Sequence, residues 1–311
     1  MVIMKKYIVF LILSVFVLNG FAQEDEKEKS EPVYETFASA YLIDNQTIFI
    51  PDAKTLEFAI QHKFGTFGNG LSDLFGIYSS SNIRLALNYV PVKNLQVGAG
   101  LARLNMTSDV NAKWTFLTQT TDNSIPVSVA LYGIAAIDGR NEDDFSANKT
   151  HQPGEGLAQY SIRFSDRISY FSQVIVARKF NDWLSLQGGA SFSHFNMVES
   201  DEDHDKIALH LNGKIKFSPQ SSFIFNLDHP LKIKSLSEQR EWTVANNPLP
   251  NISFGWEIAT YTHAFQIYIG TSSSFYPQDV VMFNGTGNQS RKWLDKEILR
   301  FGFNITRLWM F

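Results

Sequence analysis

The chain has 311 residues, 27 basic and 31 acidic side chains, a formal net charge of −4 and no cysteine. Without cysteine, disulfide frameworks, thiolate catalysis, cysteine-ligated metals and a lipoprotein anchor are all excluded. The acidic balance argues against a nucleic-acid partner, because such partners favour clustered positive charge. The 26 Phe residues go with a mean hydropathy of only −0.13, as expected for strands that are wet on one face and apolar on the other.

The N-terminus has the pattern of an export signal. Lys5 and Lys6 precede an apolar stretch over 7–18, and small residues stand at 20 and 22, where a signal peptidase cleaves. The apolar stretch is too short to cross a bilayer as a helix, which needs about 20 residues. We therefore predict a signal peptide over 1–22 and a periplasmic leader over 23–54, disordered over its charged part 23–32.

The remaining residues, 55–311, predict a single all-β domain: an antiparallel transmembrane β-barrel of about twelve strands. Twelve segments show strand-like patterns, and most approach the roughly 9–11 residues that a tilted strand needs to cross a membrane. Residues 206–217 alternate clearly between apolar and polar side chains, whereas 169–180 is apolar on both faces. The segments are 55–64, 83–90, 95–104, 111–119, 125–137, 169–180, 184–195, 206–217, 222–229, 251–260, 263–272 and 298–308.

The connections between these segments alternate between short and long along the whole chain. Barrels in bacterial outer membranes have tight periplasmic turns and longer external loops, and an even strand number leaves both termini in the periplasm. A soluble β-sandwich gives no reason for this alternation. We expect short turns at 91–94, 120–124, 181–183, 218–221 and 261–262, with longer loops at 65–82, 105–110, 138–168, 196–205, 230–250 and 273–297.

The last eleven residues alternate as the closing strand of such a barrel does. The odd positions from 301 to 311 are mostly aromatic, and the terminal residue is aromatic too. We interpret Phe303, Trp309 and Phe311 as an insertion signal for the barrel-assembly machinery, with outer-membrane lipid as the surrounding partner.

Residues 62–119 resemble an uncharacterised family of Gram-negative outer-membrane β-barrel proteins, a domain of unknown function. The resemblance implies a barrel in the cell envelope from about residue 40 to the C-terminus, and it supplies no catalytic or ligand residues. The segments that carry it are 65–69, 71–77, 82–89 and 113–118.

The strand phases turn a set of charged side chains towards the barrel interior. Such charges either pair into a network that fills a closed scaffold or line a water-filled pore. We expect a porin-like passive channel for small polar solutes or ions. The alternative is a non-conducting scaffold whose external loops bind a partner. The predicted lumen-lining residues are Glu57, Lys63, Arg84, Lys113, Lys214, Lys216, Asp228 and Glu257.

Other features favour neither catalysis nor a cofactor. The acidic loops 138–144 and 199–205 lack the spacing of a calcium-binding loop, and no G-x-S-x-G motif accompanies the histidines. We expect no enzyme activity, no cofactor and no metal. The Gly-rich loop 65–82 either folds into the barrel mouth or packs on its rim.

Overall fold

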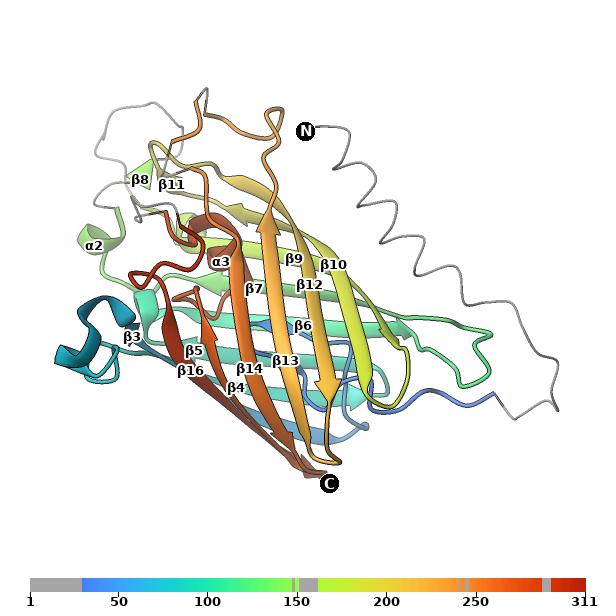
Figure 1. Ribbon diagram of the computed structural model, residues 1–311. Helices are drawn as coiled ribbons and strands as arrows, with labels where there is room; N and C mark the ends of the chain where they lie inside the picture. The colour runs from blue at the N-terminus through green and yellow to red at the C-terminus, as the bar shows by residue number, and fades with distance from the viewer. Residues whose placement is uncertain (1–29, 147–148, 151–161, 240, 244–245, 287–291) are drawn as a thin grey trace, which may run out of the picture.

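The computed structural model describes residues 30–311, except 147–148, 151–161, 240, 244–245 and 287–291. The predicted signal peptide therefore lies outside the described residues. Twelve antiparallel strands form one closed barrel, in which each strand pairs with its neighbours along the chain and β16 pairs with β3 to close the ring (Figure 1). The all-β fold class and the predicted strand number are confirmed.

The twelve barrel strands match the predicted segments closely. Closure leaves every strand with two partners, which matters where water does not reach the backbone. The strands are β3 (Thr55–Thr66), β4 (Asn82–Val92), β5 (Leu95–Ala102), β6 (Ser108–Leu117), β7 (Ser128–Ile137), β9 (Ile168–Lys179), β10 (Leu184–Phe195), β12 (Asp205–Lys216), β13 (Ser221–Pro230), β14 (Asn251–Ala259), β15 (His263–Gly270) and β16 (Arg300–Met310).

The described residues also form short strands and helices that are not part of the barrel sheet. Two small sheets pair β1 (Tyr41–Leu42) with β2 (Asn45–Gln46) and β8 (Lys149–Thr150) with β11 (Val198–Glu199). The helices are η1 (Phe67–Asp73), η2 (Leu104–Met106), α2 (Glu142–Ser146), η3 (Phe164–Arg167) and α3 (Pro277–Phe283). Within the described parts of the chain, no helix is long and apolar enough to cross a membrane.

The barrel is polar inside and apolar outside. On β3 every second residue is buried, and these inward residues include Glu57, Gln61 and Lys63, each 1% exposed. The outward residues are apolar and partly exposed, such as Leu87 at 51% and Trp256 at 54%. This inversion of a soluble protein's pattern is what a lipid-facing barrel requires.

The connections define two ends of the barrel. We call the short-turn end the one where β4 turns into β5 and β14 into β15, and the long-loop end the opposite one. The Gly-rich loop 65–82 leaves the long-loop end as η1 and packs on the rim: Phe67 contacts Phe301 and Phe75, while Leu71 is 80% exposed.

Candidate functional site

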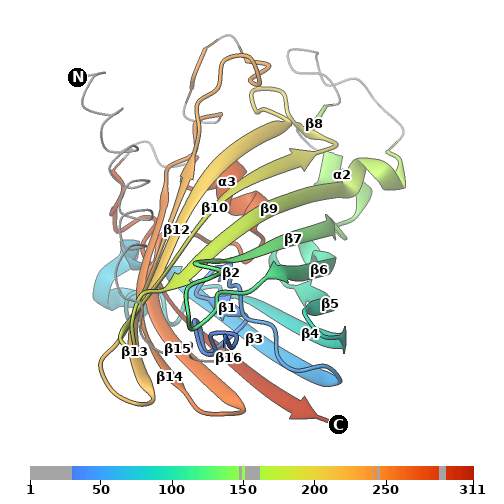
Figure 2. The same cartoon turned by 90° about the vertical axis from the view of Figure 1, so that its right-hand side faces the viewer.

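The lumen is occupied by a piece of the chain that precedes the first barrel strand. Residues 36–48 are all buried except Ala38, which is half-buried, and β1 and β2 form a small hairpin inside the ring of strands (Figure 2). We call residues 35–50 the N-terminal insert. These residues belong to the predicted periplasmic leader, 23–54, but they lie within the barrel and not ahead of it.

The N-terminal insert passes the short-turn end of the barrel on its way in. Val33 N donates to Gln119 O at 2.7 Å, and Ser30 Oγ donates to Asp122 Oδ1 at 2.9 Å. Hydrogen bonds from Thr120 and Ser124 hold the pKa of Asp122 below its ordinary value, so this carboxylate stays ionised at neutral pH. The start of the insert is thereby fixed to the turn between β6 and β7.

The hairpin tip has a strained backbone that the barrel wall holds. Ile43 has a φ of 54°, a left-handed conformation that β-branched residues rarely adopt. Its N–H donates to Gln266 Oε1 at 3.0 Å, and its carbonyl accepts from Asn304 Nδ2 at 2.7 Å. These wall amides compensate for strain that costs of the order of 1–3 kcal/mol.

Amide side chains of the wall satisfy much of the insert backbone. Asn226 donates to Leu42 O at 2.7 Å, and Gln266 donates to Tyr41 O at 2.8 Å. On the opposite side of the hairpin, Gln187 accepts from Ile48 N at 3.0 Å and donates to Gln46 O at 2.7 Å. A short hairpin without a sheet to join is thus held by side chains, because buried backbone groups need partners.

A second segment enters the barrel from the long-loop end. Residues 271–284, which include α3, follow β15 and pack against β9, β10, β12 and β13 (Figure 1). Tyr276 is 1% exposed and Val281 is fully buried. The Tyr276 hydroxyl donates to Thr107 O at 3.2 Å, and Phe283 contacts the Phe195 ring at 5.0 Å. We call these residues the loop insert. Residues 273–284 of it lie in the region predicted only as a long loop, 273–297, and residues 271–272 were predicted as the end of the preceding strand.

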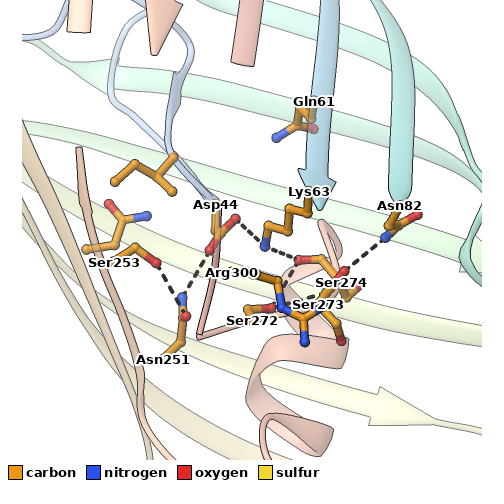
Figure 3. A network of polar contacts seen from close by, with 12 residues as sticks. Asp44, Gln61, Lys63, Asn82, Asn251, Ser253, Ser272, Ser273, Ser274 and Arg300 are labelled. Atoms are coloured by element: carbon orange, nitrogen blue, oxygen red, sulfur yellow. Dashed lines mark hydrogen bonds and ion pairs between the residues drawn. The ribbon is translucent and has the colours of Figure 1, made fainter. Parts of the chain in front are cut away.

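The two inserts meet at Lys63 of β3 (Figure 3). The Lys63 ammonium lies 2.6 Å from Asp44 Oδ1 of the N-terminal insert and donates to Ser274 O of the loop insert at 2.7 Å. It also lies 5.0 Å from the centre of the Phe275 ring. The other oxygen of Asp44 accepts from Asn251 Nδ2 at 3.2 Å. A single buried lysine therefore joins the barrel wall to both inserts.

Arg84 of β4 joins polar side chains of two other strands, Asp109 of β6 and Gln61 of β3. Its guanidinium binds Asp109 through two hydrogen bonds of 2.9 and 2.8 Å and donates to Gln61 at 2.9 Å. Gly100 leaves room for this pair, because a Cβ there would lie 2.5 Å from Asp109 Oδ2 and 2.7 Å from Arg84 Nη2. The guanidinium also lies 5.5 Å from the ring centre of Tyr276.

The structure places the predicted lumen residues inside the barrel, with one near its edge. Seven of the eight are buried: Glu57, Lys63, Arg84, Lys113, Lys214, Asp228 and Glu257. Lys216 is half-buried at the short-turn end, 4.0 Å from Glu35 Oε2. The hydrogen-bond partners of the seven buried side chains are amides and other polar groups of the wall, and the two inserts. Asp109, which was not among the predicted lumen residues, belongs to the same group of side chains, because it binds Arg84.

The inner face has an apolar sector on β7 and β9. Ala130, Ile134 and Ile175 face inward and belong to one buried cluster. The same cluster contains Phe37, Leu42 and Ile48 of the N-terminal insert, and Tyr276 and Val281 of the loop insert. This arrangement explains why residues 169–180 are apolar on both faces: one face meets the exterior and the other meets the inserts.

Three neighbouring strands bring together Ser191, His210 and Asp228. His210 Nδ1 lies 2.7 Å from Asp228 Oδ1, and its Nε2 lies 2.7 Å from Ser191 Oγ. Asp228 also accepts from Asn45 at 2.6 Å and from Asn251 at 2.8 Å. The carboxylate is thus a hub that connects the wall to the N-terminal insert. No sequence motif reveals this group, because its members come from three separate strands.

The acidic loops have partners of their own. Asp203 contacts Lys206 at 3.1 Å, and Asp205 contacts His194 at 2.6 Å. In the other acidic loop, Asp138 pairs with Arg140 at 2.6 Å. Among the described residues, no three His, Asp or Glu side chains gather as a metal site. A cavity of about 180 Å³ at the long-loop end is lined by Asp138, Phe145, Arg167, Ser274 and Asp279, among others.

The aromatic residues of the closing strand lie on its outer side. Phe303 is partly exposed and stacks on His62 at 4.9 Å, Trp309 lies under the Arg307 guanidinium at 5.0 Å, and Phe311 is 82% exposed. Their role as an insertion signal stays a prediction.

The fold is similar to several solved barrels. The KdgM porin in complex with disordered oligogalacturonate matches with a TM-score of 0.44 and 7% identity, over 81% of this chain and 98% of that one. The COG4313 outer membrane channel from Pseudomonas putida F1 matches with a TM-score of 0.40 and 12% identity, over 84% of this chain and 97% of that one. The Pseudomonas putida toluene transporter TodX matches with a TM-score of 0.34 and 8% identity, over 84% of this chain and 89% of that one. Likeness of this degree carries no function from one barrel to another.

The comparison with curated proteins gave no match. The family described as "Membrane bound beta barrel domain (DUF5777)" matches residues 37–309. The match begins at Phe37, inside the N-terminal insert and not at the first barrel strand, so residues 37–50 of the insert fall within the family's domain. The chain belongs to this family of membrane-bound β-barrels.

Proposed function

We propose that this protein is a gated outer-membrane channel for small polar solutes or ions, closed here by its own N-terminal insert. The observation that carries the proposal is that the N-terminal insert occupies the lumen beside its lysines, and that among the described residues it is joined covalently to the ring of strands only through β3. The loop insert is joined to strands of the ring at both ends, to β15 and to β16, whereas residues 35–50 are joined to a strand only at β3. The described residues ahead of them are held at the short-turn end by hydrogen bonds alone, among them those of Ser30 and Val33 to the β6–β7 turn. Withdrawal towards the short-turn end requires no change in the strands of the ring.

The contacts of the insert suit a reversible closure. Once the insert leaves, water can replace its backbone as the hydrogen-bond partner of Gln187, Asn226 and Gln266. The strain at Ile43 also favours release. We propose a non-enzymatic role, in outer-membrane lipid, after insertion by the barrel-assembly machinery.

A disulfide that fastens the insert to the wall tests this function in the full-length protein. Ser39 Oγ lies 3.3 Å from Thr306 Oγ1 on β16, and the chain has no cysteine of its own. We expect the Ser39→Cys/Thr306→Cys variant to conduct in discrete steps in a planar bilayer when reduced and to be silent when oxidised. Ser218→Cys/Ser221→Cys is the matched control, since these two residues exchange backbone hydrogen bonds of 3.2 and 3.3 Å within the turn between β12 and β13.

The outcomes separate the gate from the channel. Equal conductance of the oxidised and reduced Ser39/Thr306 pair would mean that the insert is not the gate. Silence in both states, from protein that circular dichroism shows to be folded, would overturn the channel. The filled lumen would then support the second candidate, a closed scaffold whose external loops bind a partner.

A further inference from the structure

The cationic side chains of the lumen share one property: four of them contact oxygens of the N-terminal insert. Lys63 contacts the Asp44 carboxylate at 2.6 Å. Lys113 donates to Gln46 Oε1 at 3.0 Å, and Lys214 donates to Glu35 O at 3.2 Å. Lys216 is more distant, 4.0 Å from the Glu35 carboxylate. The insert therefore supplies the acceptors of lysines on three different strands.

The carboxylates of the wall depend much less on the insert. Asp109 is held by Arg84 through two hydrogen bonds, Glu57 accepts from Asn88 at 2.8 Å, and Glu257 accepts from Gln266 at 2.8 Å. Asp228 accepts from Asn45 of the insert, but it keeps Asn251 and His210 on the wall. Withdrawal of the insert thus leaves these carboxylates with wall donors. It removes the insert acceptors of the lysines, of which Lys63 keeps Ser274 O of the loop insert.

The charge balance of the lumen changes in the same direction. In this set, five cations on the wall (Lys63, Arg84, Lys113, Lys214 and Lys216) face four carboxylates. The insert adds the carboxylates of Glu35 and Asp44. The net charge of these groups is −1 with the insert in place and +1 after it withdraws. A buried cation without a partner is costly, so the freed lysines favour a new anion in the lumen.

The lysines are also spread along the barrel axis. Lys63 lies three residues from the long-loop end of β3, Lys113 lies in the middle of β6, and Lys214 lies two residues from the short-turn end of β12. Several moderate sites in succession suit conduction, because a solute must bind well enough to enter and weakly enough to leave. Arg84 is occupied by Asp109, so recognition falls to lysine ammonium groups, which act as point charges.

We propose that the N-terminal insert stands in for an anionic solute, and that the opened channel passes small carboxylates along Lys63, Lys113 and Lys214. The proposal rests on the channel function above and names its solute class. A carboxylate is the best candidate because the shortest contact between a lumen lysine and the insert, 2.6 Å, is itself made by a carboxylate, that of Asp44.

The test measures reversal potentials of single open channels, which do not depend on how often a channel opens. In a potassium chloride gradient, we expect the full-length Asp44→Asn variant to pass chloride in preference to potassium. With potassium acetate in place of the chloride salt, the preference for the anion persists. Lys113→Gln and Lys214→Gln, added together, remove that preference while each Gln still offers a hydrogen-bond donor.

Lys93→Gln is the matched control, because Lys93 is exposed in the turn between β4 and β5 and its loss leaves the selectivity unchanged. Preference for potassium, or selectivity unaffected by the Lys113/Lys214 change, would overturn the proposal while leaving a working channel. Passage of chloride with exclusion of acetate would overturn the carboxylate class. Absence of any conductance counts instead against the channel function itself.

Discussion

Replacement of Asp44 by Asn tests the junction where the two inserts meet. The change keeps the shape of the side chain and removes its charge, so that Lys63, 1% exposed, loses the carboxylate 2.6 Å away. Loss of one partner from a buried ion pair costs about 3–5 kcal/mol. The Asn oxygen still accepts a hydrogen bond, so we expect about 3 kcal/mol, at the lower end of that range.

This cost falls on the closed state, because only there does Asp44 contact Lys63. A difference of 1.4 kcal/mol is tenfold in an equilibrium constant, so the ratio of open to closed channels rises roughly 10²-fold. Open probability in a planar bilayer at fixed voltage measures this ratio directly. Asp52→Asn makes the same chemical change at an exposed position between the insert and β3, and it leaves the open probability as in the original chain.

A double variant identifies the cause of the shift. Lys63→Gln in the Asp44→Asn background restores a neutral, hydrogen-bonded pair, and the open probability falls back towards that of the original chain. An Asp44→Asn variant that stays as closed as the original chain would refute the reasoning. So would a double variant that opens more than Asp44→Asn alone, because the charge imbalance would then not be the cause.

Three further changes probe the insert and the barrel wall. Gln266→Ala removes the hydrogen bonds to Ile43 N and Tyr41 O and destabilises the seated insert by about 1–3 kcal/mol. We expect faster amide hydrogen exchange over 41–46; unchanged exchange would contradict the role of Gln266 in holding the insert. Leu87→Arg puts a charge on the lipid face and lowers the free energy of unfolding in vesicles by about 2–4 kcal/mol, whereas Leu71→Arg on the rim loop does not; equal effects contradict the assigned lipid face. Lys216→Gln changes the free energy of opening by at most about 1 kcal/mol, since the contact of Lys216 with Glu35 is long and partly exposed. A shift as large as that of Asp44→Asn would contradict the smaller contribution assigned to Lys216.

Most of the strands were predictable because each carries its own period. On β3 and β12 the alternation of apolar and polar residues is local, and the alternation of short and long connections fixed the strand number. Boundaries moved by only a few residues, as in β7, which begins at Ser128 and not at 125. The turn between β6 and β7 is accordingly longer than the predicted 120–124. The inward direction of Lys63 and Arg84 follows from the same period.

The two inserts were not predictable from local patterns. The strands of the N-terminal hairpin have two residues each, too few to show a period. Its partners Gln187, Gln266 and Asn304 come from distant parts of the sequence. Residues 271–284 have the composition of a loop, and only the barrel around them explains why Tyr276 and Val281 are buried.

A signal for the inserts was nevertheless present in the wall. An inward apolar side chain gains nothing from a water-filled pore, so Phe171 and Ile175 on the inner face of β9 require an apolar cover. The inner face of β7, with Ala130 and Ile134, continues the same sector. A barrel strand that is apolar on both faces therefore predicts a lumen that is filled on that side. In this chain the apolar sector accounts for the position of the inserts, and the lysines across the lumen account for the acceptors that the N-terminal insert presents to them.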